Sequence, residues 1–243
     1  MSACVTNKPA KPSLSKKKES ELYVQMGVRY LEMNMLKDAK EKLEAAVGTD
    51  STNADAHNAL GALYERFKQF DKAEDAYKKA MTLDNDNASI SNNYGRFLCT
   101  RGDYQGGLKL LKQALSLPLN NRKWFAYTHI GHCELMRGQE QLAEDNFRQA
   151  LLENKRYLPA LFEMQKISYR SGKYMSARAF LARYLEISKH TPATLWYAVQ
   201  TERVLGNEKL AEEYKGELFN QFPASKEAQQ LKKSMRSKGD GNK

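Results

Sequence analysis

A repeat of about 34 residues runs through most of the 243-residue chain and limits the architecture that it can adopt. Six equivalent positions recur at intervals of 34, 34, 36, 34 and 34 residues, at Gly27, Gly61, Gly95, Gly131, Gln165 and Val199. Twelve residues after each of them stands a small residue, at Ala39, Ala73, Gly107, Ala143, Ala177 and Ala211. A period of this length is typical of a solenoid, in which each unit buries its apolar face by stacking on its neighbours.

Each repeat is predicted to contain two helices joined by a short turn. The predicted turn residues are Asn34, Lys68, Gly102, Gly138, Gly172 and Gly206. Glycine and asparagine end helices readily because they adopt the left-handed backbone conformation at low cost. Lysine lacks this preference, so we expect a wider turn at Lys68. Asp71 and Glu74 fit a capping box at the start of the following helix.

The second unit resembles a tetratricopeptide repeat. The residues that carry this resemblance are Leu60, Gly61, Tyr64, Ala73, Tyr77 and Ala80. The fifth and sixth units match mainly through their spacing. The resemblance implies an all-α fold, a right-handed superhelical solenoid of six tetratricopeptide repeats plus a C-terminal capping helix. We expect the repeats to occupy residues 20–225 as one domain, and residues 226–243 to form the end of the capping helix and a disordered basic tail.

The net charge of +10 is concentrated at the two ends of the chain. Residues 1–19 contain five lysines and one glutamate, and residues 226–243 contain six basic and two acidic residues. The repeats are therefore nearly neutral, and they lack the alternation of basic and aromatic residues that single-strand binders use. We predict no nucleic-acid partner.

The amino terminus contains a candidate lipid-attachment site. Ser2-Ala3-Cys4 resembles the end of a bacterial lipoprotein signal peptide, although no apolar stretch precedes it in this sequence. Residues 6–18 are rich in lysine, proline and serine, a composition typical of a flexible tether. We therefore expect residues 1–19 to hold a lipid-bearing Cys4 and a tether.

The other two cysteines, Cys99 and Cys133, lie in first helices of adjacent repeats, where we expect small buried apolar residues. Their spacing leaves open whether they form a disulfide. No CxxC motif is present, and His129 and His132 lack further ligands at metal-binding spacing. No motif places a catalytic set of residues. We predict no metal, no cofactor and no enzymatic activity.

Taken together, these features resemble the PilF/PilW family of type IV pilus pilotins. The specific stretches are Asn58 to Tyr64, Asn92 to Cys99 and Phe222 to Ser225. The resemblance implies a lipoprotein anchored in the outer membrane and facing the periplasm. It also implies a partner, the secretin subunit of the type IV pilus outer-membrane pore, whose targeting and multimerisation a pilotin promotes.

The predicted partner-binding surface is the concave side of the array, to which positions 2, 5, 9 and 12 of each first helix point in this repeat. An apolar floor in unit one and a polar, asparagine-rich wall in units two and three would suit an amphipathic segment. The candidate residues are Val24, Val28, Leu31, Asn58, Ala62, Asn92 and Arg96.

Two alternatives remain at the level of the sequence. The first is a soluble tetratricopeptide adaptor or co-chaperone that binds a peptide segment. Such adaptors hold a peptide carboxylate with a clamp of Lys and Asn from unit one, where this chain has Val24 and Val28. The second is that the tether or a neighbouring helix covers the apolar floor. If partner binding does not depend on the floor, the next candidate surface is formed by the aromatic residues Phe162, Tyr169 and Trp196.

Overall fold

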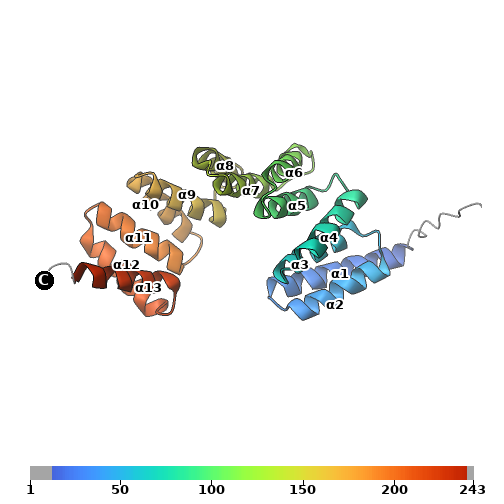
Figure 1. The fold of residues 1–243 in the computed structure, drawn as a ribbon, viewed down its shortest axis with the longest axis horizontal. Helices are drawn as coiled ribbons and strands as arrows, with labels where there is room; N and C mark the ends of the chain where they lie inside the picture. The colour runs from blue at the N-terminus through green and yellow to red at the C-terminus, as the bar shows by residue number, and fades with distance from the viewer. Residues whose placement is uncertain (1–12, 240–243) are drawn as a thin grey trace, which may run out of the picture. The chain divides into compact units, whose positions relative to one another are not determined.

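The computed structural model describes residues 13–239, which form thirteen α-helices and no strand (Figure 1). Twelve of the helices are six consecutive pairs, and the thirteenth follows them, as the repeat pattern predicts. In chain order they are α1 (Leu14–Glu32), α2 (Leu36–Thr49), α3 (Ala54–Arg66), α4 (Phe70–Leu83), α5 (Ala88–Thr100), α6 (Tyr104–Ser116), α7 (Lys123–Met136), α8 (Glu140–Glu153), α9 (Leu158–Arg170), α10 (Tyr174–Leu185), α11 (Pro192–Val204), α12 (Glu208–Gln221) and α13 (Lys226–Gly239).

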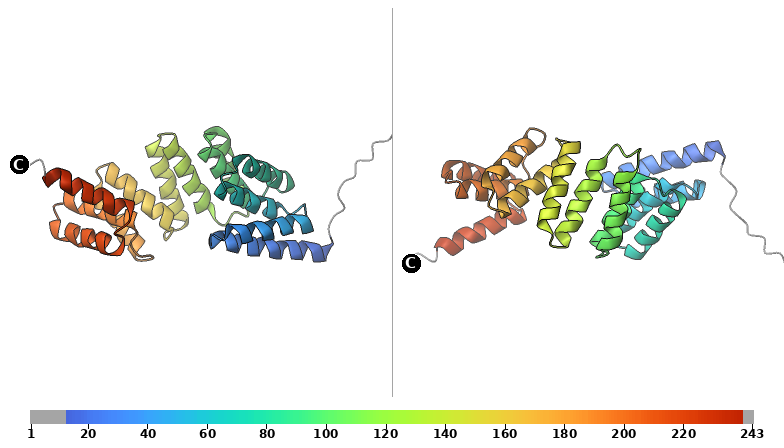
Figure 2. Two further views of the ribbon diagram at one scale, coloured as in Figure 1. Left: turned by 60° about the horizontal axis from the view of Figure 1, so that its bottom comes forward. Right: turned by 90° about the horizontal axis from the view of Figure 1, so that it is seen from above.

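The helices divide into two compact units, with the boundary between Asn121 and Arg122. The first unit contains α1 to α6, and the second contains α7 to α13. In each unit the helices of a pair pack on one another and on the next pair (Figure 2). The boundary coincides with the 36-residue interval, because the two extra residues lengthen the connection between α6 and α7.

The two helices of a pair approach closely where the repeat places its small residues. Ala39 and Ala73 are fully buried at these crossings. A Cβ atom added at Gly61 would lie 2.6 Å from the ring of the fully buried Tyr77. Only the absence of a side chain leaves room for that ring, so the spacing of small residues is a packing requirement.

All six predicted turn residues have a positive φ angle, and the turn at Lys68 is not wider than the others. Lys68 has φ 58°, close to the 59° of Asn34. The backbone hydrogen bonds also correspond. Gln69 N donates to Tyr64 O at 2.9 Å, as Met35 N donates to Tyr30 O at 2.9 Å. The prediction of a wider turn is wrong because packing of the two helices imposes the turn, and the chain accepts a lysine in the left-handed conformation.

Replacing Lys68 with glycine should stabilise the protein. Glycine adopts a positive φ without the steric penalty that lysine has, and we expect the free energy of unfolding to rise by about 0.5–1 kcal/mol. Chemical denaturation followed by circular dichroism measures this change. Asn34→Gly is the matched control and should give a smaller gain, because asparagine tolerates this conformation. A destabilised Lys68→Gly variant would contradict the explanation.

Side-chain caps occur at several helix starts, but not at the predicted one. The N-cap of α4 is Gln69, and no side-chain hydrogen bond caps it; Asp71 lies inside the helix. The capping-box prediction is therefore wrong, because the helix after the turn at Lys68 begins two residues earlier than that box requires. A capping box does occur at α11, between Thr191 and Thr194.

Both ends of the repeat array extend further as helix than the sequence suggested. Ser13 caps α1, so residues 14–19 of the predicted tether are helical. Ser20 is buried and anchors this end, because its Oγ donates to Ala46 O at 2.8 Å and accepts from Asn53 Nδ2 at 2.8 Å. At the other end α13 packs against α11 through the buried Ala228 and Leu231, as a capping helix should.

Cys99 and Cys133 are buried, as expected, but each is disulfide-bonded, so the prediction of simple apolar cysteines is incomplete. Cys4 and most of the predicted tether lie outside the described residues, as does the end of the basic tail. Within residues 13–239, no helix combines the length and the apolar character needed to cross a bilayer.

Candidate partner-binding surface

The apolar floor predicted on α1 reaches the surface of the first unit. Val28 is 38% exposed, and Val24 and Leu31 are half-buried. Leu31 also packs against the core cluster that contains Leu43 and Leu60. Helix α1 contacts α3, which carries the small, half-buried Ala62. Among the described residues, Val28 is therefore accessible to a partner, whereas Leu31 is partly buried in the core.

The two asparagines of the predicted wall are more buried than side chains that contact a bound peptide directly are expected to be. Asn58 is 8% exposed and Asn92 is 7% exposed. Asn58 Oδ1 accepts a hydrogen bond from Asn93 Nδ2 at 3.1 Å. The Oδ1 atom of Asn92 is buried and has no hydrogen-bond partner among the described residues. An unpaired buried acceptor costs about 1–3 kcal/mol, so a donor that reached Asn92 would recover this energy.

Arg96 is already paired with an acidic residue of the neighbouring repeat. Its guanidinium donates to both carboxylate oxygens of Glu65, at 3.1 and 2.5 Å. The hydroxyl of the buried Tyr77 donates to the same carboxylate at 2.6 Å. Burial and the charge of Glu65 raise the pKa of Tyr77. A carboxylate of a partner would have to share Arg96 with Glu65. Because Glu65 already neutralises the guanidinium, this part of the wall is polar but has little net charge to attract a partner.

Sequence reasoning missed Glu65 as the partner of Arg96. The two residues stand at the twelfth position of repeat two and the ninth of repeat three, which adjacent first helices bring together. A systematic comparison of opposite charges at these positions would have found the pair.

An aromatic cluster covers the equivalent side of the first helices in the second unit. Tyr169 and Trp196 lie 6.3 Å apart between ring centroids, and Tyr197 lies 4.9 Å from Trp196 and 6.3 Å from Phe162. All four rings are half-buried. Beside Trp196, a cavity of about 460 Å³ opens between α11 and α13. The sequence predicted Phe162, Tyr169 and Trp196 as a candidate surface. It did not predict that Tyr197 joins this cluster or that α13 lines the cavity beside it.

The histidines of α7 have structural neighbours. His132 Nε2 lies 3.5 Å from Glu163 Oε1, and Lys166 Nζ donates to the same carboxylate at 2.8 Å. Burial alone would raise the pKa of Glu163, but the hydrogen bonds from His132 and Lys166 outweigh it and lower this pKa. Among residues 13–239, no three His, Cys, Asp or Glu side chains are grouped to hold a metal ion.

Comparison with known proteins shows that the chain is similar to tetratricopeptide-repeat proteins. The family model of the tetratricopeptide repeat matches residues 54–87, the second repeat. The type IV pilus assembly protein PilF of Pseudomonas aeruginosa is 25% identical over 234 residues, which cover 95% of this chain and 93% of that protein.

Two solved structures agree with the fold over nearly their whole lengths. The structure from the functional characterisation of Pseudomonas aeruginosa PilF matches with a TM-score of 0.78 and 24% identity, covering 90% of this chain and 99% of that one. The crystal structure of PilW, described as a widely conserved type IV pilus biogenesis factor, matches with a TM-score of 0.77 and 27% identity, covering 87% and 97%. With six helix pairs in register, the chain has the tetratricopeptide-repeat fold and is similar over nearly its whole length to the PilF and PilW proteins.

Proposed function

We propose that the protein is a pilotin, which acts in type IV pilus biogenesis by binding secretin subunits and promoting their targeting to the outer membrane and their multimerisation. The similarity to PilF and PilW supports a role in the pilus. The observation that carries the binding role is the exposed apolar residue Val28, on a helix whose neighbour presents the small Ala62.

The floor has the size of a contact for a short amphipathic segment. Val24, Val28 and Leu31 lie on α1 at positions 5, 9 and 12, which is the spacing of one helix face. Burying the exposed parts of these side chains would contribute roughly 3 to 6 kcal/mol at most, before the cost of ordering the partner. The polar side chains Asn58, Asn92 and Arg96 on α3 and α5 would then contact the backbone or polar side chains of the segment.

Replacing Val28 with aspartate should abolish binding of the secretin without unfolding the protein. The side chain is partly exposed, so a carboxylate remains hydrated in the free protein but would be buried without a partner in the complex. Co-purification of secretin with the pilotin, and the yield of heat-resistant secretin multimers, measure the effect.

Leu22→Asp is the matched control for this experiment. Leu22 is 54% exposed on the same helix but stands at position 3, away from the floor. This variant should bind secretin normally. Retention of binding by a folded Val28→Asp protein would contradict the proposed site and would direct attention to Phe162, Tyr169 and Trp196 in the second unit.

The localisation in this proposal rests on Cys4. Replacing Cys4 with serine should remove the lipid, move the protein from the outer membrane to the soluble periplasmic fraction and leave its helical signal unchanged. Membrane fractionation and mass spectrometry of the native protein measure this result. An unmodified Cys4 in protein that still sediments with the outer membrane would contradict a lipid anchor.

A further inference from the structure

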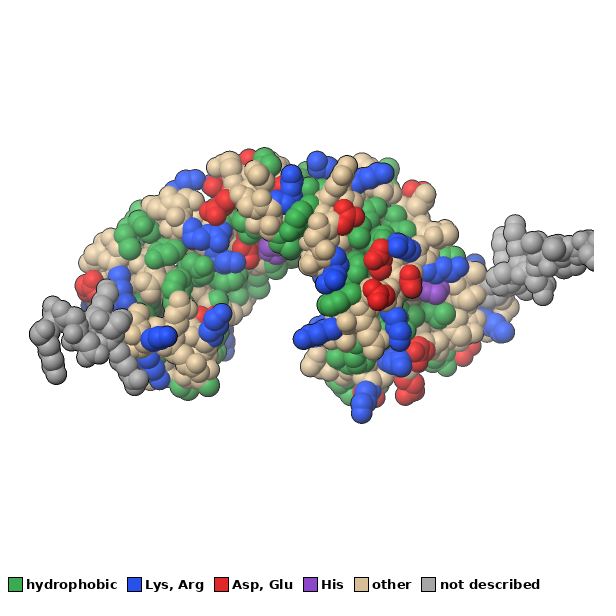
Figure 3. All heavy atoms as spheres, viewed as in Figure 1, with side chains coloured by type: hydrophobic (Ala, Val, Ile, Leu, Met, Phe, Trp, Pro, Cys, Tyr) green, Lys and Arg blue, Asp and Glu red, His purple; other side chains and the backbone are tan. Residues whose placement is uncertain are grey.

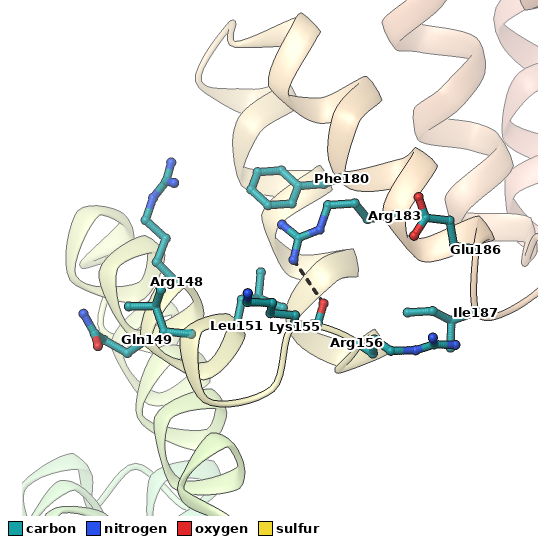
Figure 4. Close-up of a pocket in the computed structure, with 10 residues that line it drawn as sticks. Arg148, Gln149, Leu151, Lys155, Arg156, Phe180, Arg183, Glu186 and Ile187 are labelled. Atoms are coloured by element: carbon teal, nitrogen blue, oxygen red, sulfur yellow. Dashed lines mark hydrogen bonds between the residues drawn. The ribbon is translucent and has the colours of Figure 1, made fainter.

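A hollow of about 670 Å³ lies between α8 and α10 in the second unit, among residues that the proposed function does not use (Figure 4). Both helices pack on α9, and the connection between α8 and α9 closes one side of the hollow. Ligand-binding hollows in proteins commonly have about 300–1,000 Å³. Its size therefore suits a short segment of another molecule.

Apolar side chains line the hollow. Leu151 is nearly buried at 6% exposure, while Leu152 is 70% exposed, and Phe180 and Ile187 on the other side are half-buried. A leucine that is exposed to this extent beside further apolar groups is the kind of surface that partners cover.

Basic side chains surround these apolar groups. Arg148, Lys155, Arg156 and Arg183 line the hollow, and Glu186 is the one carboxylate among its lining residues. Arg148 is paired with Glu144 at 2.5 Å, and Arg183 donates to Lys155 O at 3.0 Å and lies over the ring of Phe180. In the described part of the chain, no carboxylate lies within ion-pair distance of Lys155 or Arg156. Figure 3 shows basic and hydrophobic side chains mixed over much of the second unit.

The same positions in repeats two and three have a different character, although the local structure is equivalent. There Gln113 Nε2 donates to Asn85 O at 3.0 Å, which corresponds to the contact of Arg183 with Lys155 O. The next residue is Asp86, where the later repeats have Arg156. Thr82 stands in the place of Leu152. The fold therefore does not require Leu152, Lys155 or Arg156 at these positions, which points to binding.

We propose that this basic hollow is a second docking site, which binds an acidic amphipathic segment of a partner protein. Its apolar residues would contact the apolar face of the segment, and Lys155 and Arg156 would pair with its carboxylates. A groove between neighbouring helices is a common receptor for an amphipathic helix. A flat membrane surface would not reach into a hollow whose lining includes Leu151, which is only 6% exposed.

Fluorescence anisotropy with the full chain tests this proposal. The probe is a short labelled peptide with leucines on one helical face and glutamates on the other, and its matched control has glutamines in place of the glutamates. We expect the acidic peptide to bind at least about tenfold more tightly, with an affinity that falls as salt increases. Lys155→Glu, Arg156→Glu and Leu152→Asp should each weaken binding by about tenfold or more.

Lys79→Glu is the control for charge, because Lys79 is an exposed lysine on α4 and its replacement changes the net charge equally. It should leave the affinity unchanged. The proposed function is tested separately, by co-purification of secretin. Equal binding of the two peptides, or equal loss with Lys79→Glu, would overturn the proposal. So would binding to phosphatidylglycerol vesicles, but not to the peptide, that depends on Lys155 and Arg156.

Discussion

A proline at position 60 is expected to lower the free energy of unfolding by about 3 kcal/mol or more. Leu60 lies in the middle of α3 and is 7% exposed. Proline removes one helical hydrogen bond there, and its ring clashes with the preceding turn. Helix α3 contacts α1, α2, α4 and α5, so the distortion reaches every repeat of the first unit. Denaturant unfolding followed by circular dichroism measures the loss.

Ala54→Pro is the matched control for Leu60→Pro. Ala54 is the first residue of α3, where proline costs little, and Asn53 before it has an extended conformation with ψ 102° that proline permits. Hydrogen exchange should show faster opening of α1 to α6 in the Leu60→Pro protein, because each repeat is stabilised mainly by its neighbours. Equal stability of the two proline variants would contradict the position of α3.

Replacing Arg178 with alanine should destabilise the second unit by about 3–5 kcal/mol, the second largest effect that we predict. Arg178 on α10 donates through Nε and Nη2 to the two carboxylate oxygens of Glu202 on α11, with 2.8 Å between Nε and Oε1. The side chain of Glu202 is 2% exposed, so the variant would leave a buried carboxylate with little compensation. Asn207 Nδ2 donates a hydrogen bond to Oε2 of Glu202 at 3.3 Å, so the carboxylate would keep this one polar partner in the variant.

A double variant distinguishes two contributions to this destabilisation: the lost ion pair between Arg178 and Glu202, and the cost of leaving the Glu202 carboxylate buried without a partner. Arg178→Met combined with Glu202→Leu removes both charges while keeping similar volumes, and it should recover most of the stability that Arg178→Ala loses. The melting temperature and the denaturation midpoint measure both variants. A double variant as unstable as the single one would show that Arg178 stabilises through packing and not through Glu202.

The repeat made the helix pairs, the close crossings and the turn positions predictable, because each depends on residues close together in sequence. The turn at Lys68 was mispredicted for the opposite reason. Lysine disfavours a positive φ locally, but the contacts of α3 and α4 along their whole length outweigh a local penalty of about 1 kcal/mol. The same shift of the helix start placed Asp71 inside α4 instead of at its cap.

The candidate surface was less predictable than the fold. The sequence identified which side chains lie on one face of the first helices, since this follows from helical periodicity. It did not reveal that Glu65 neutralises Arg96 or that Asn93 bonds to Asn58, because such pairs depend on how neighbouring repeats are aligned. The basic hollow between α8 and α10 was not predicted either, since its residues come from two separate helices and from the segments that follow each of them.

The repeated turns have a stereochemical consequence. Residues 34, 68, 102, 138, 172 and 206 all have φ between 58° and 91°, the region that is natural for D-amino acids. At Lys68 the chain therefore maintains a conformation of the opposite handedness from that of its own building blocks. A chemically synthesised full-length chain with a D-residue at position 68 should form this turn at least as readily as the natural protein with L-lysine.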